Sequence, residues 1–211
     1  MPARLRPTAP IAASAILVGD PGRALMLAQV LLEQPKMSNH ARGLWGYSGV
    51  TPEGKELTIQ STGMGGPSAS VVLADLAELG VRRAIRIGTC TSLGDLELGQ
   101  LLIVSEARTP VGGAAHPDPE LTEGLSQSLP DVQLGVAVSL DTIHDPERER
   151  PSVLAEAADM QTAALLGSGT ELGVALAALL IVTERNDSGQ LQDEELEETA
   201  KRAGTVAATL L

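Results

Sequence analysis

The sequence predicts a single α/β domain in which a central mixed β-sheet is flanked by helices. Short apolar runs alternate with stretches of helical periodicity, the pattern of a sheet that helices cover on both faces. The 211 residues fit one domain, and 43% hydrophobic residues are enough for its core. Because only 1% are aromatic, Leu, Val, Ile and Ala must build that core. We expect residues 1–12 to form an N-terminal arm and residues 13–211 to form the domain.

The first half of the chain contains four apolar runs that predict strands, at Ala13–Val18, Leu44–Val50, Leu57–Ser61 and Arg83–Ile87. Between them we expect a helix at Ala24–Glu33 and a loop at Pro35–Gly43. A second helix follows Gly66 and ends at Gly80, which supplies the C-terminal stop. In this helix Asp75 is expected away from the apolar face.

The second half continues the alternation of strands and helices. Strands are predicted at Leu101–Val104, Gln133–Val138 and Val174–Val182. A surface helix with loops is expected within His116–Pro130, and a helix interrupted near Gly167–Gly169 within Pro151–Leu172. The chain ends in a predicted helix, Gln192–Leu211, whose acidic first turn suits the helix dipole.

The charge of the chain excludes several classes of partner. With 15 basic and 27 acidic residues the net charge is −12, so the protein has no global attraction to nucleic acid or anionic membranes. An anion would have to be bound by a local cluster of arginines. A single cysteine excludes an internal disulfide, and three histidines without ligand spacing predict no metal site. No signal peptide or membrane-spanning run is visible, so we expect a cytoplasmic protein.

Three glycine-bounded strand ends carry arginines or hydroxyl groups: Gly19–Arg23, Gly63–Ser68 and Arg86–Thr89. Ligands of α/β sheets gather at the carboxyl ends of strands, so these segments can converge on one site. A guanidinium in an apolar run requires an anionic partner, which is most often phosphate or carboxylate. Each segment also has a plain structural interpretation. The first can be a strand-to-helix turn, the second tight helix–sheet packing, and Arg86 a buried ion pair with Asp20 or Asp141.

Taken in order, these motifs resemble the nucleoside phosphorylase family, which includes uridine phosphorylase and the hexameric bacterial purine nucleoside phosphorylases. The resemblance rests on VGDPGR, NHARG, STGMGGPSASVVLADLAELGVR and IRIGTC, and more loosely on SLDTIHDPERER, ADMQTAAL and LLIVTE. It implies a pentosyltransferase in which phosphate attacks C1′ of a nucleoside, the base leaves and ribose 1-phosphate forms. Inorganic phosphate is then the co-substrate and no cofactor is needed. The central stretch is most similar to uridine phosphorylase, so a uridine-like pyrimidine is favoured, and a purine is the alternative.

The resemblance also assigns the phosphate site, to Gly19, Arg23, Arg86 and Thr89. Arg86 and Glu184 would act in catalysis. Arg42 corresponds to an arginine that reaches the site of a neighbouring subunit, which implies a dimer as the minimal unit and a hexamer built from dimers. Its plain interpretation is a solvated loop charge.

The nucleoside side departs from the family at several positions. Met64, Met160 and Gln161 would bind ribose, although methionines more often fill a core, and Gln161 replaces a glutamate and loses its charge-assisted bond. The base would lie against Thr91, Ile143, His144 and Arg148, where Thr91 replaces a glycine and Ile143 a stacking phenylalanine. Glu184 is the nearest equivalent of the aspartate with which purine phosphorylases protonate the base, or else a solvated carboxylate beside Arg185.

Three functions are consistent with these departures. The protein can be a phosphorylase with altered base or sugar specificity. It can be a nucleosidase, in which water replaces phosphate, although such relatives usually lack the phosphate arginines. It can also be a family member that binds a nucleoside or phosphorylated ligand without turning it over.

Overall fold

The described strands form one mixed sheet, which confirms the predicted fold class. The structure is a computed structural model that describes residues 4–142, 154–185 and 189–211. The strands are β1 (Ser14–Val18), β2 (Glu33–Asn39), β3 (Gly46–Val50), β4 (Glu56–Ser61), β5 (Arg83–Ser92), β6 (Leu101–Arg108), β7 (Ala114–Ala115), β8 (Leu134–Ser139), β9 (Ala157–Asp159), β10 (Ala175–Arg185) and β11 (Gly189–Gln190). Among the described residues their order is β11-β10-β6-β8-β9-β5-β1-β4-β3-β2, with β7 beside β6. Because β10 also pairs with β5, the strands β10, β6, β8, β9 and β5 close into a ring.

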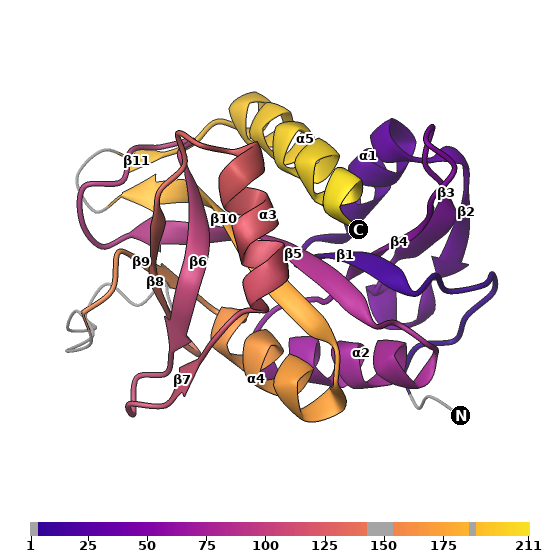
Figure 1. Ribbon diagram of the computed structural model, residues 1–211, viewed down its shortest axis with the longest axis horizontal. Coiled ribbons are helices and arrows are strands. Elements are labelled where there is room, and N and C mark those ends of the chain that lie inside the picture. Colours follow the sequence, from indigo (N-terminus) through magenta and orange to yellow (C-terminus); the bar gives the residue numbers. More distant parts are fainter. Residues whose placement is uncertain (1–3, 143–153, 186–188) are drawn as a thin grey trace.

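Helices cover both faces of this sheet (Figure 1). They are α1 (Pro21–Leu31), α2 (Gly66–Glu78), α3 (Pro119–Ser128), α4 (Thr162–Leu172) and α5 (Asp193–Leu210). The helices α2 and α4 pack on one face, and α1, α3 and α5 on the other. Two helices begin at an aspartate followed by proline: Asp20 accepts a hydrogen bond from the Arg23 N–H, and Asp118 from the Leu121 N–H.

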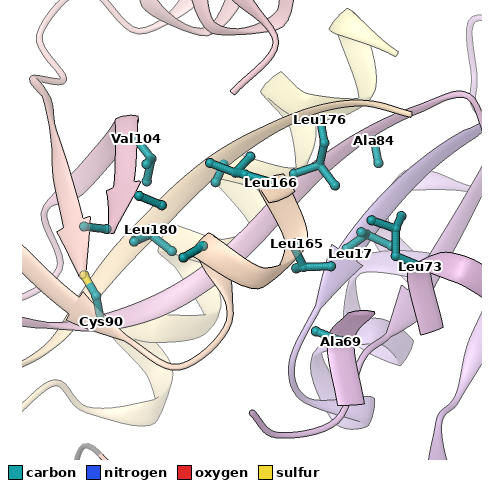
Figure 2. Packing of buried hydrophobic residues seen from close by; sticks show 14 of the residues in the cluster. Leu17, Ala69, Leu73, Ala84, Cys90, Val104, Leu165, Leu166, Leu176 and Leu180 are labelled. Carbon is teal, nitrogen blue, oxygen red and sulfur yellow. The ribbon is translucent and has the colours of Figure 1, made fainter. Parts of the chain in front are cut away.

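The core on each face is aliphatic, as the composition predicts. On the α2 and α4 face, Leu17 of β1, Leu73 of α2 and Leu165 of α4 belong to one buried cluster (Figure 2). Burying each such leucine stabilises the fold by about 1.5–3 kcal/mol. On the opposite face, the aliphatic side chains of β5 and β10 pack under α1, α3 and α5. The sheet is therefore held rigidly between two apolar layers.

Two segments differ from the sequence-based expectation. The expected loop at Pro35–Gly43 is mostly strand β2, which pairs antiparallel with β3 at the edge of the sheet, where a proline is tolerated. His40 and a 3₁₀ turn at Ala41–Gly43 make up the rest of the expected loop. From Leu154 onwards, where the structure describes the expected helix within Pro151–Leu172, helical structure starts at Thr162, after strand β9, and runs through Gly167–Gly169 without a break.

The strands β5 and β10 are longer than predicted. The expected ends, Ile87 and Val182, are followed by further paired residues up to Ser92 and Arg185. The two strands pair with each other up to these ends, so the polar residues there, whose sequence is typical of a loop, remain in strand conformation. Arg86 consequently lies within a strand and not at its end.

Asp75, which we expected away from the apolar face of α2, is nevertheless not exposed to solvent. Its side chain is buried because the proposed arm, described from Arg4 onwards, lies over this part of α2. The Asp75 Oδ2 atom accepts hydrogen bonds from the backbone N–H groups of Arg4 and Leu5 at 2.9 and 2.8 Å. Further along, the Arg6 N–H donates to Asn39 of β2. The arm is thus tied to the domain by directed hydrogen bonds.

Candidate active site

A cavity of about 380 Å³ opens where β1, β4, β5, β9 and β10 end. This volume lies in the usual range for small-molecule sites. Most of the predicted site residues line it: Gly19, Arg23, Met64, Arg86, Thr89, Thr91, Met160, Gln161 and Glu184. Asp20, Gly63, Gly65, Gly88, Cys90, Asp159 and Thr183 line it as well. The three glycine-bounded segments therefore converge on one cavity as predicted, although Arg86–Thr89 lies within β5 and not at its end.

The remaining predicted residues are not among those that the structure shows lining the cavity. Arg42 is exposed in the 3₁₀ turn after β2, outside the cavity of its own chain, and its φ of 60° is in the left-handed region. Ile143, His144 and Arg148 lie outside the described residues. The segment Asp141–Pro151, from which these base contacts were predicted, is thus described only up to Thr142.

The glycine loop between β4 and α2 forms one wall of the cavity. Gly63 and Gly65 have φ values of 72° and 80°, a backbone conformation that favours glycine. The Ser68 hydroxyl donates to the Thr62 carbonyl at 2.6 Å and closes the loop onto the first turn of α2. The positive end of the α2 dipole therefore lies beside the cavity, where it favours an anion.

Arg86 reaches the cavity from inside the sheet and is only 3% exposed. Its guanidinium lies over Gly88, two residues further along the same face of β5. A Cβ atom at Gly88 would come within 2.6 Å of Arg86 Nη2, so glycine is required there. The Arg86 Nη2 atom forms an ion pair of 2.9 Å with Asp159 Oδ2. The buried ion pair that the sequence left open therefore exists, but its partner is neither Asp20 nor Asp141.

Asp159 holds this arrangement together. Besides Arg86, its carboxylate accepts hydrogen bonds from the Gln161 N–H, from the Thr162 N–H and hydroxyl, and from the Ser139 hydroxyl. The two backbone donors belong to the start of α4, so the same carboxylate caps that helix. We did not single out Asp159 as a site residue from the sequence. An aspartate just before a helical run of small and apolar residues is the signal that could have identified it.

Arg23 forms the second cationic wall of the cavity. Burial lowers the pKa of its guanidinium, the carboxylate of Asp20 partly offsets this, and the nearby Arg86 lowers the pKa further. Within the described part of the chain no hydrogen bond from the Arg23 side chain is found, and only its backbone N–H is engaged, by Asp20. Two guanidiniums close enough to affect each other are a favourable arrangement for a shared anion.

Glu184 and Thr91 face each other at another part of the cavity. A bulge in β10 places Thr183 between paired positions and brings Glu184 opposite Thr91. The Thr91 hydroxyl donates to Glu184 Oε2 at 3.2 Å, and Gln190 donates to Oε1 at 3.4 Å. Burial raises the pKa of the Cys90 thiol, which disfavours the thiolate form that a nucleophilic cysteine needs.

The comparison with known families agrees with this geometry. A profile described as "Phosphorylase superfamily" matches residues 14–211. The chain belongs to the phosphorylase superfamily. This confirms the family expected from the motifs, that of nucleoside phosphorylases, which are pentosyltransferases. The match extends over nearly the whole described domain.

Individual members of the phosphorylase superfamily are similar over most of the chain. A DeoD-type purine nucleoside phosphorylase from Alkaliphilus metalliredigens is 30% identical over 90% of both chains. The DeoD-type enzyme from Caldanaerobacter subterraneus is 31% identical over 88% of both. Among solved structures, uridine phosphorylase from Vibrio fischeri superposes with a TM-score of 0.84 at 23% identity, covering 95% of this chain and 91% of that one. Purine nucleoside phosphorylase from Toxoplasma gondii gives 0.82 at 22%, covering 95% and 89%. The two structures support the fold.

No cluster of three or more His, Cys, Asp or Glu side chains in the described part of the molecule has the arrangement of a metal site. None of the helices in the same residues has the length and apolar character needed to cross a bilayer.

Breaking the buried ion pair between Arg86 and Asp159 should be strongly destabilising. We expect Asp159→Ala to lower the free energy of unfolding by roughly 3–5 kcal/mol, because it leaves a buried guanidinium without its counter-ion. The matched control is Glu120→Ala, which removes the exposed partner of Arg83 and should cost about 0–1 kcal/mol. Urea unfolding followed by circular dichroism measures both. Equal losses for the two variants would contradict the role given to Asp159.

Proposed function

We propose that this protein is a purine nucleoside phosphorylase, which uses inorganic phosphate to split a purine nucleoside into free base and pentose 1-phosphate. The observation that carries the proposal is a single cavity with two guanidiniums, Arg23 and Arg86, at one part and a carboxylate, Glu184, at another. Membership of the phosphorylase superfamily supports the reaction type. The named relatives at 30% and 31% identity support the purine.

The phosphate would lie between Arg23, the glycine loop and Thr89. Arg23 can donate charge-assisted hydrogen bonds, and the N–H groups near Gly63 and the α2 dipole add partial positive charge. Arg86 has little freedom, since Asp159 and Gln161 hold its guanidinium, so it would contribute charge from a fixed position. A phosphate oxygen then attacks C1′ while the C1′–N9 bond breaks and its electrons pass to the base. Holding the phosphate in line with this bond is the main task of these residues.

Glu184 is the group that favours a purine. As N9 of a purine leaves, negative charge spreads over its imidazole ring and N7 becomes basic. A carboxyl group at Glu184 can deliver a proton there or hold a protonated N7 by a charge-assisted hydrogen bond. Uracil presents carbonyl oxygens in place of this nitrogen, and a carboxylate repels them. The pyrimidine preference expected from the central stretch is therefore the weaker proposal.

Arg42 would complete the phosphate site of a second copy of the chain. In the described cavity Asp20, Asp159 and Glu184 oppose two guanidiniums, so there is no surplus positive charge for a phosphate dianion. Arg42 is exposed in a turn outside this cavity, and it can supply the missing charge only across an interface. We therefore propose a homo-oligomer with a dimer as its minimal unit, and a hexamer by resemblance to the family.

Phosphate-dependent cleavage is the first test. We expect inosine or adenosine to release free base only when phosphate is present, in a panel that also contains uridine, thymidine and methylthioadenosine. Arg23→Ala should raise the phosphate KM by roughly 10- to 100-fold, because it removes a charge-assisted hydrogen bond worth about 1.5–3 kcal/mol. Arg83→Ala, on the same sheet but outside the cavity, is the control. Base release without phosphate would indicate a nucleosidase, and no release from any substrate would refute the enzyme assignment.

The base assignment depends on Glu184. We expect Glu184→Gln to lower kcat/KM for inosine by about 10²- to 10⁴-fold, the usual contribution of general acid catalysis, without a comparable rise in the phosphate KM. Glu53→Gln, in the exposed turn before β4, is the control. Steady-state assays with inosine and uridine measure both variants. If wild-type protein cleaves uridine faster than inosine, or if Glu184→Gln leaves inosine cleavage intact, the purine proposal is wrong.

A complementation experiment tests Arg42. Arg42→Ala and Arg23→Ala should each be weakly active alone. When the two chains are co-expressed, mixed dimers contain one intact site, so activity should recover to about a quarter of the wild-type value per subunit. Size-exclusion chromatography of differently tagged chains verifies that mixed oligomers form. Mixed oligomers without recovered activity would show that Arg42 does not act across the interface.

A further inference from the structure

The middle of the cavity, between the phosphate end and the base end, is where the sugar of a nucleoside would lie. Gln161 is placed here, at the start of α4, and is 3% exposed. Its Oε1 atom accepts hydrogen bonds from the Thr62 hydroxyl at 3.0 Å and from Arg86 Nη1 at 2.8 Å. Its Nε2 atom donates to the carbonyl oxygens of Gly63 and Gly65 at 2.5 and 3.4 Å. An amide has two acceptor and two donor positions, and Arg86 and the loop occupy three of them. The fourth faces the Thr62 hydroxyl, whose one proton can also go to the Val18 carbonyl oxygen, 3.0 Å from Thr62 Oγ1.

The neighbouring acceptor is also occupied. Asp159 already receives hydrogen bonds from Arg86, Ser139, Thr162 and the backbone at the start of α4. Met64 and Met160 also line the cavity, and their thioethers are weak acceptors. The threonines of the wall, Thr89, Thr91 and Thr183, present neutral hydroxyl groups. Carboxylates remain only at the two ends, in Asp20 and Glu184. Among the described side chains, the middle of the cavity thus has no free strong acceptor for a sugar hydroxyl.

We propose that Gln161 is a positioning residue that holds the glycine loop against Arg86. Because its amide is engaged in this way, the cavity does not distinguish nucleosides by hydrogen bonds to their sugar hydroxyl groups. The amide connects the two parts of the anion site: one side of it touches the guanidinium, and the other side touches the loop at Gly63 and Gly65. The proposal deepens the proposed function and rests on it for the identity of the ligand, since it concerns the sugar of the same nucleoside.

The orientation of the amide explains why a glutamine suits this position. The Nε2 atom faces two backbone carbonyl oxygens, which need a donor. A glutamate would place a carboxylate oxygen against the carbonyls of Gly63 and Gly65, and this repulsion would push the loop away. Gln161 therefore matches the loop conformation of this chain, and the amide nitrogen is as important as the oxygen that contacts Arg86.

The affinities of nucleosides that lack sugar hydroxyl groups test whether the cavity binds those hydroxyl groups. We expect inosine, 2′-deoxyinosine and 2′,3′-dideoxyinosine to bind with dissociation constants within about threefold of one another, measured by isothermal titration calorimetry without phosphate. A hydroxyl held by a charged or well-placed acceptor would contribute about 1.5–3 kcal/mol, or roughly 10- to 150-fold in affinity. A loss of tenfold or more from inosine to the dideoxy compound would overturn the proposal. This experiment needs no variant and no turnover.

Variants at position 161 test the positioning role. Gln161→Ala and Gln161→Glu should each raise the phosphate KM by roughly tenfold, since the bridge that the amide makes between Arg86 and the loop is broken, while the affinity ratio of inosine to dideoxyinosine stays unchanged. Gln127→Ala, a glutamine exposed on α3, is the control. An unchanged phosphate KM in both folded variants would overturn the positioning role. A tenfold change in the sugar ratio would show that Gln161 reads a hydroxyl.

The two proposals fail in different ways. If no member of the nucleoside panel is cleaved with phosphate, the proposed function is wrong, yet the calorimetric comparison of inosine with its deoxy analogues still decides whether the sugar hydroxyls are read. If cleavage is phosphate-dependent but the ribonucleoside binds at least tenfold more tightly than the dideoxynucleoside, the function stands and the inference about Gln161 fails. Thermal melting of each variant separates a loss of folding from a loss of positioning.

Discussion

The burial of one guanidinium governs the arrangement of the site. Arg86 lies inside a strand between two apolar layers, and a charge there is tolerated only when a counter-ion and hydrogen bonds surround it. Asp159 and Gln161 satisfy this requirement, and Gly88 leaves the space that the side chain needs. The geometry of the cavity follows from this constraint, because each group that satisfies Arg86 also fixes a second element: Asp159 fixes the start of α4, and Gln161 fixes the glycine loop.

Because Asp159 and Gln161 each hold both Arg86 and a second element, the proposed phosphate site is preorganised. The loop at Gly63 has a conformation that favours glycine, and it would be mobile if its carbonyls were free. The Gln161 amide removes that freedom by linking the loop to a charge already held in the core. Groups that are held in place before the ligand arrives cost less entropy at binding, which favours a reaction that depends on aligning phosphate with the breaking bond. The structural ion pair and the proposed chemistry are therefore parts of one network.

The sequence predicted the features that arise from local chemistry. Glycines at the ends of apolar runs marked the loop at Gly63 and its convergence with Arg86 in one cavity, and the aliphatic composition indicated the two apolar layers. The features it missed depend on contacts between distant segments. Strand β2 has a polar sequence and exists because β3 pairs with it. Asp75 is buried because the N-terminal arm crosses it, and Asp159 meets Arg86 because β9 lies antiparallel to β5. Spacing along the chain contains no information about such pairings.

The charge balance of the cavity explains how an acidic protein can use phosphate. A net charge of −12 repels anions at long range, although salt screens this repulsion within about 10 Å at 0.1 M. Inside the described cavity the carboxylates outnumber the guanidiniums, so the electrostatic potential averaged over the cavity does not attract phosphate. Under the proposed function, recognition would come from directed donors at short range, namely the Arg23 guanidinium, the N–H groups of the glycine loop and the Arg42 that we propose reaches the site from a second subunit. Such donors select phosphate by the geometry of its oxygens. An excess of positive charge would be less selective, because it would bind other anions as well.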